Sequence, residues 1–223
     1  MNIHITQPGK LAILGEDGNC WFPLFEQFHG NPGKLAGFLL KGFGFPNRDA
    51  ARNEESATPF QDEHTLRLLR VAAIHAKASC GDGFGGFKGL VDSLSVILFT
   101  RSDHAKLEAG DPSPKRGKTA LVLHEGFTHE RISKEELDEV LSYLDNHLPP
   151  CSRTNWHTMA DIAGHLRAQF LLPTLQQIFT ESPGKRRLAP EEVTDEDVCL
   201  ILCVNPGFPP DMLASISKAL ETL

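Results

Sequence analysis

The stretch Gly15-Glu16-Asp17-Gly18-Asn19-Cys20-Trp21-Phe22 decides the predicted fold of this chain. It follows a short apolar run, Leu11 to Leu14, that predicts a strand, and it begins with a polar turn. From Trp21 the large apolar residues recur at the spacing of one helical face, which predicts a helix to about His29. Cys20 would then lie at a helix N-terminus, where unpaired backbone N–H groups and the helix dipole favour a thiolate. The alternative is a buried structural cysteine, because free cysteine usually behaves as a small core residue.

Composition limits the classes of protein to consider. The chain has 223 residues, with 40% hydrophobic and 23% charged residues, which is ordinary for a globular protein. Its net charge of −7 argues against a nucleic-acid binder. No apolar run reaches the length of a membrane span, and the first residues lack the pattern of a signal peptide. Five cysteines without a CxxC pair favour free thiols, so we expect a cytoplasmic protein.

The rest of the chain predicts alternating helices and strands. The apolar spacing predicts helices near 35–42, 62–78, 87–94 and 133–144, the last with a capping box formed by Ser133 and Glu136. Apolar runs predict strands at 95–100, 119–124 and 198–204. We place a boundary at Pro149-Pro150, so that residues 1–150 form one domain and 151–223 a mainly helical C-terminal extension with a strand near 198–204.

The glycine-rich stretch from Gly81 to Gly86 contains the letters of a dinucleotide-binding motif, GxGxxG. That motif requires a strand before the first glycine, whereas a helix is predicted here. Glycine tolerates positive φ and commonly ends a helix. The stretch therefore predicts a helix end and a turn rather than a nucleotide site.

Three blocks in order resemble the ovarian-tumour (OTU) family of deubiquitinating cysteine proteases over residues 11–132. The first block is Asp17-Gly18-Asn19-Cys20 followed by an aromatic residue and a helical pattern. The second, Asp82-Gly83-Phe84-Gly85-Gly86-Phe87, is similar to a glycine-rich segment of the family. The third is the run from Thr119 to Leu123 with Gly126 and His129, which resembles the strand and loop that present the catalytic histidine. The resemblance implies an α+β fold, a papain-like core with a small central sheet flanked by helices.

The resemblance also implies the chemistry of the site. Cys20 would be the nucleophile, His129 the general base and Asp17 the acid that orients the base. The backbone amides of Asp17, Gly18 and Cys20 would hold the oxyanion. His124 is the alternative base. The implied function is hydrolysis of ubiquitin or ubiquitin-like conjugates in the cytosol of the protein's own cell, or of a host if the protein is secreted. It needs no cofactor or metal, and we expect no nucleic-acid or membrane partner.

A second interpretation starts from the positions where the chain departs from the family pattern. Glu130 follows His129 where an aromatic residue is common, and Arg131 stands where Asp or Asn is common. Arginine has no acceptor with which to orient an imidazole. The alternative function is therefore a non-catalytic module that binds ubiquitin or another protein without cleaving it.

Overall fold

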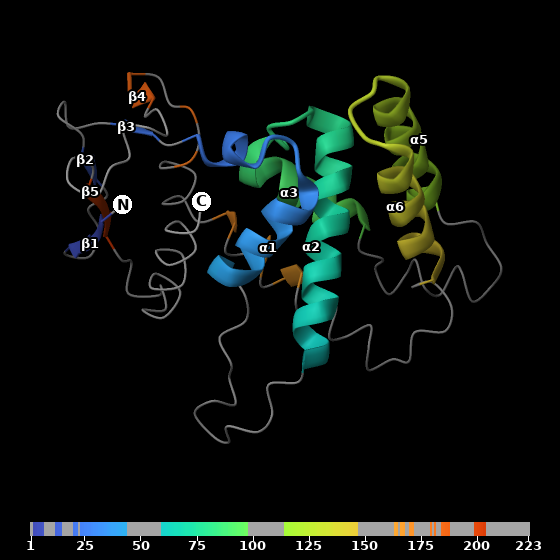
Figure 1. Cartoon of the computed structure of the whole chain (residues 1–223), viewed down its shortest axis with the longest axis horizontal. Helices are drawn as coiled ribbons and strands as arrows, with labels where there is room; N and C mark the ends of the chain where they lie inside the picture. Colours follow the sequence, from blue (N-terminus) through green and yellow to red (C-terminus); the bar gives the residue numbers. More distant parts are fainter. Residues whose placement is uncertain are drawn as a thin grey trace.

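The structure of the chain is a computed structural model that describes residues 2–6, 12–14, 20–21, 23–43, 59–97, 114–146, 163–164, 166–167, 170–171, 179, 181, 184–187 and 199–203. Helices dominate this part of the chain (Figure 1). The elements in chain order are β1 (Asn2–Thr6), β2 (Ala12–Leu14), β3 (Cys20–Trp21), the 3₁₀ helix η1 (Leu24–Phe28), α1 (Pro32–Phe43), α2 (Pro59–Cys80), α3 (Gly86–Ile97), α5 (Pro114–Thr128), α6 (Lys134–Asn146), β4 (Arg186–Arg187) and β5 (Cys199–Cys203).

Helix α2 is the centre of the helical part. It contacts α1, α3, α5 and α6, with α1 and α3 on one side and the α5–α6 pair on the other (Figure 1). Residues 71–74 of α2 are all buried, as expected for a helix that neighbours surround. The predicted helix 62–78 is thus confirmed, and it ends as the glycines predicted. Gly81 has a φ of +81° and donates its N–H to the carbonyl of Lys77 at 2.8 Å.

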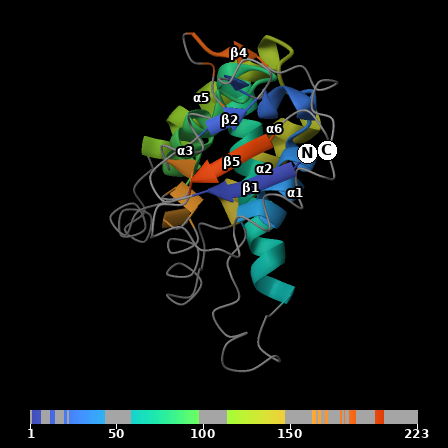
Figure 2. The same ribbon diagram turned by 90° about the vertical axis from the view of Figure 1, so that its left-hand side faces the viewer.

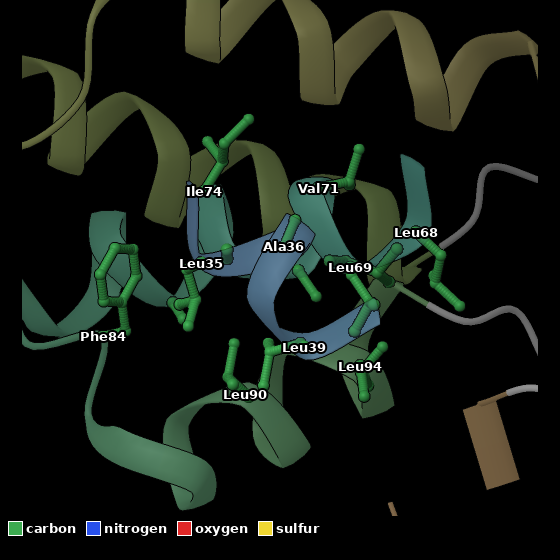
Figure 3. Close-up of a cluster of buried hydrophobic side chains, with 14 of the residues drawn as sticks. Leu35, Ala36, Leu39, Leu68, Leu69, Val71, Ile74, Phe84, Leu90 and Leu94 are labelled. Atoms are coloured by element: carbon green, nitrogen blue, oxygen red, sulfur yellow. The ribbon is translucent and has the colours of Figure 1, made fainter. Parts of the chain in front are cut away.

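The core lies where α1, α2 and α3 meet (Figure 3). Leu35 and Leu39 of α1, Leu69 of α2, and Leu90 and Leu94 of α3 all belong to this core cluster. All five side chains have no exposed surface. Burial of each leucine contributes about 1.5–3 kcal/mol, so this cluster holds the three helices together.

Phe87 of α3 joins the N-terminal and C-terminal parts of the chain. Its ring lies 4.9 Å from that of Phe25 in η1, edge to face. It also lies 5.4 Å from the ring of Phe170 and 6.0 Å from that of Phe179. Both of these residues come after the boundary predicted at 149–150. They nevertheless belong to the same hydrophobic core as α3.

The strands are short and lie at one end of the molecule (Figures 1 and 2). β5 lies between β1 and β2; it runs parallel to β1, with Asn2 opposite Cys199, and antiparallel to β2. β3 and β4 form a separate two-stranded pair.

The predicted α+β fold is wrong. A papain-like core needs a central sheet between helices, whereas here the helical part packs around α2 and the short strands lie beside it. Of the strands predicted at 95–100, 119–124 and 198–204, the last is present as β5, whereas the described residues of the other two are helical. Residues 95–97 continue α3, and residues 119–124 lie inside α5. A short apolar run suits a buried strand and a buried helix equally well. In α5 the buried residues Thr119, Leu123 and Gly126 follow a helical spacing.

Candidate functional site

Cys20, the predicted nucleophile, lies in strand β3 and not at a helix start. The predicted helix from Trp21 is instead the short 3₁₀ helix η1, which begins at Leu24. The helix-dipole argument for a Cys20 thiolate therefore fails. Asp17 and Gly18, the predicted orienting acid and oxyanion donor, lie outside the described residues.

The surroundings of β3 are basic. Cys20 is opposite Arg186 in the parallel pair of β3 and β4, and Trp21 is opposite Arg187. The Arg187 guanidinium lies 5.9 Å from the centre of the Trp21 ring and forms an ion pair with Glu26 of η1. The basic stretch 185–187 therefore ties β4 to β3 and η1.

The two predicted bases lie on or beside α5. His124 is exposed on the helix, and His129 is exposed in the turn that follows it. Neither belongs to a strand, so the predicted presentation of the histidine by a strand is wrong. Helix α5 and strand β3 lie at opposite ends of the molecule (Figure 1). The structure thus does not bring the segment with Cys20 to the segments with His124 and His129.

An open groove lies between α2, α6 and the turn that joins α5 to α6, and we call it the α2–α6 groove. Its volume is about 910 Å³. Phe127, at the end of α5, and Ile132, in the turn, supply its apolar surface. Phe127 is 41% exposed, whereas Ile132 is buried. The charged side chains that line it are Arg70, Lys77, Glu130, Arg131, Glu135, Glu136 and Glu139.

The turn at one end of this groove has a well-defined geometry. The N–H of Arg131 bonds to the carbonyl of Gly126 at 2.8 Å, and the N–H of Glu130 bonds to that of Phe127 at 3.0 Å. These are the two bonds of a Schellman motif, and Glu130 takes the left-handed position with a φ of +56°. The Arg131 guanidinium then donates to the carbonyls of Ala78 and Ser79, at the end of α2. The turn is thereby fixed to α2.

Two ion pairs link α2 to α6 inside the groove. Arg70 Nε lies 2.7 Å from Glu139 Oε1, and Lys77 Nζ lies 3.4 Å from both oxygens of Glu136. Glu136 also accepts the backbone N–H of Ser133 at 2.8 Å, and its own N–H bonds to Ser133 Oγ at 3.2 Å. The predicted capping box is confirmed. Glu136, the acid of the box, also forms the ion pair with Lys77 of α2.

Two carboxylates of the groove have no such cationic partner. Among the described residues, neither Glu130 nor Glu135 forms an ion pair with a lysine or arginine. The backbone amide of Glu135 and the Ser133 side chain hold the pKa of Glu135 below its usual value, and the positive charge of Lys134 lowers it further. The half-exposed ring of Phe127 shares the groove with these two acids. The groove therefore offers negative charge beside an aromatic ring.

The sequence reasoning missed this groove. Its carboxylates belong to a helix whose cap was predicted, but Arg70 and Lys77 come from a helix some 60 residues earlier, and no local pattern joins the two. A partial signal existed at Pro114, because proline favours the first position of a helix and could have revealed α5.

Within the described ranges, no three His, Cys, Asp or Glu side chains gather to hold a metal ion. No helix in that same part of the chain is long and apolar enough to span a membrane. Comparison of the chain with family models, curated proteins and solved structures gives no match.

Proposed function

We propose that the helical part of this chain is a protein-binding module, and that the α2–α6 groove binds a basic segment of a partner protein. The observation that carries the proposal is the groove itself, which is lined by Glu130, Glu135 and the half-exposed ring of Phe127. An arginine side chain suits this surface, since its guanidinium pairs with carboxylates and stacks on aromatic rings.

The charges of the groove favour a basic partner over an acidic one. Its cations Arg70 and Lys77 are already paired with glutamates, and Arg131 donates to backbone carbonyls. An acidic ligand would have to break these contacts, whereas a basic ligand meets two carboxylates that form no ion pair among the described residues. The net charge of −7 would also speed the approach of a basic segment.

The test uses a peptide that alternates arginine and leucine, and the same peptide with glutamine in place of arginine. We expect the arginine peptide to shift the amide NMR signals of the turn after α5 and of the first turns of α6, and the glutamine peptide to leave them unchanged. Binding should weaken as salt rises from 50 to 500 mM, because exposed charges are screened. Equal shifts with both peptides would overturn the proposal.

Glu130→Gln is the matching substitution, and we expect it to weaken peptide binding about 3- to 10-fold, the value of one exposed charge contact of about 1 kcal/mol. Glu125→Gln is the control, because Glu125 is equally exposed at the end of α5 but does not line the groove. Both variants lose one negative charge. If Glu125→Gln weakens binding as much as Glu130→Gln, the effect is one of net charge and the groove is not the binding site.

Ubiquitin isopeptidase activity through Cys20 is the second candidate function. The backbone register that pairs Cys20 with Arg186 favours it, because a cation close to a thiol would stabilise the thiolate. Under this proposal a ubiquitin whose C-terminus carries an electrophile forms a covalent adduct with the wild-type protein. The Cys20→Ala variant should form no adduct. Cys80→Ala is the control, because Cys80 is a free and exposed cysteine, and this variant should still form the adduct. A folded wild-type protein that forms no adduct rules the candidate out.

A further inference from the structure

His75 and Ser93 form a buried polar contact between α2 and α3. His75 Nδ1 lies 3.0 Å from Ser93 Oγ, and the two residues are 5% and 2% exposed. The other ring nitrogen, Nε2, is fully buried and has no hydrogen-bond partner among the described residues. The imidazole is thus satisfied at one nitrogen, and it lies inside an otherwise apolar core.

A neutral imidazole tolerates this environment better than a charged one. Protonation puts an N–H on both nitrogens, and Nε2–H would then be a buried donor without an acceptor. Burial lowers the pKa of His75 from 6.5 to about 4, and burial is its one cause. The titratable groups on the neighbouring helices do not contribute to that shift.

Among the described titratable side chains on the helices that pack against α2, Tyr143 of α6 is buried, and the others are at least partly exposed. They are Lys34 and Lys41 on α1, Lys88 and Asp92 on α3, Lys118, His124 and Glu125 on α5, and Lys134, Glu135, Glu136, Asp138 and Glu139 on α6.

We propose that the His75–Ser93 contact is an acid-sensitive lock, which holds α3 against α2 while His75 is neutral and releases α3 when His75 is protonated. Releasing α3 exposes the imidazole to water and gives both N–H groups a partner. It also separates Phe87 from the other aromatic rings that it contacts, because Phe87 lies on the same helix. Arg70 and Lys77, which form the ion pairs with α6, lie on the other face of α2 from His75, so the groove keeps its shape.

The direction of the pH effect follows from proton binding. The open state binds a proton at the ordinary pKa of 6.5, and the closed state only near 4. The lock therefore acts in full above pH 6.5, weakens as the pH falls to 4, and changes no further below that. At pH 5 the ratio of open to closed molecules should be about 30-fold higher than at pH 8.

Hydrogen exchange of backbone amides, corrected for the intrinsic effect of pH, measures this ratio. We expect the amides of α3 to open about 30-fold more often at pH 5 than at pH 8, and those of α6 to change less than 3-fold. Equal acceleration in α3 and α6 would show that acid unfolds the whole protein and would overturn the lock. No acceleration in α3 would overturn it as well.

Two variants assign the effect to His75. His75→Leu should abolish the pH dependence of opening in α3, whereas His129→Gln, which removes an exposed histidine, should retain it. Ser93→Ala covers the case in which His75→Leu does not fold. It removes the hydrogen bond but leaves the histidine, so α3 should open more often at pH 8 and still respond to acid. A Ser93→Ala protein that opens no more often than wild type at pH 8 contradicts the proposal.

Discussion

Replacing Phe87 with alanine is expected to destabilise the protein by about 3–5 kcal/mol, the usual cost of removing a buried phenylalanine. Phe87 has no exposed surface, and its ring contacts Phe25, Phe170 and Phe179. Removing it leaves a cavity bordered by rings from three separate parts of the chain, which cannot all move inward together. A whole domain is stable by only about 5–15 kcal/mol, so this single loss is a large share.

Denaturation by guanidinium, followed by far-UV circular dichroism, measures this loss, and the thermal midpoint should fall by about 10 °C. Phe127→Ala is the matched control. It deletes the same side chain from a position that is 41% exposed, so we expect it to cost less than about 1 kcal/mol. If Phe87→Ala were as mild as this control, the aromatic cluster would not hold Phe170 and Phe179 on the helical part.

The same cluster shows what the sequence could and could not predict. Helix α3 was predicted from 87–94, because Phe87, Leu90, Val91 and Leu94 have a helical spacing. That spacing says which face is buried but not what covers it. The partners Phe170 and Phe179 lie more than 80 residues further on, beyond a boundary inferred from two prolines. Contacts at that separation leave no local pattern.

Local signals with a specific mechanism were the reliable ones. Ser133 and Glu136 were predicted to cap a helix, and both bonds are present. Gly81 was predicted to end a helix, and it does so with a positive φ. No local signal of this kind supported the predicted catalytic arrangement. It required residues 119–124 to form a strand that presents a histidine. With that segment helical, His124 lies on α5 and His129 directly after it, and α5 is far from β3.

Gly126→Ala should destabilise the protein even though alanine is the better helix former. A Cβ at Gly126 would lie 2.6 Å from Ala78 Cβ and 2.8 Å from Ala78 Cα, closer than any real contact. Helix α5 would have to move away from α2, and this movement would also pull Arg131 from the carbonyls of Ala78 and Ser79. Such overpacking costs about 1–3 kcal/mol. The gain in helix propensity is about 1 kcal/mol, so the loss outweighs it.

Gly117 provides the opposite result within the same helix. It is exposed, and a Cβ there would meet nothing within 4 Å, so Gly117→Ala should stabilise the protein by up to about 1 kcal/mol. The sign of the change thus separates helix propensity from the close approach of α5 to α2.

A double-mutant cycle decides whether Ala78 is the obstacle. Ala78→Gly removes the Cβ that would lie 2.6 Å from a new side chain at Gly126 but leaves Ala78 Cα at 2.8 Å, so combining it with Gly126→Ala should cost less than the sum of the two single changes without restoring the wild-type stability. The free energy of unfolding in guanidinium measures all four proteins. Strict additivity would contradict the close approach of the Ala78 Cβ to a new side chain at Gly126.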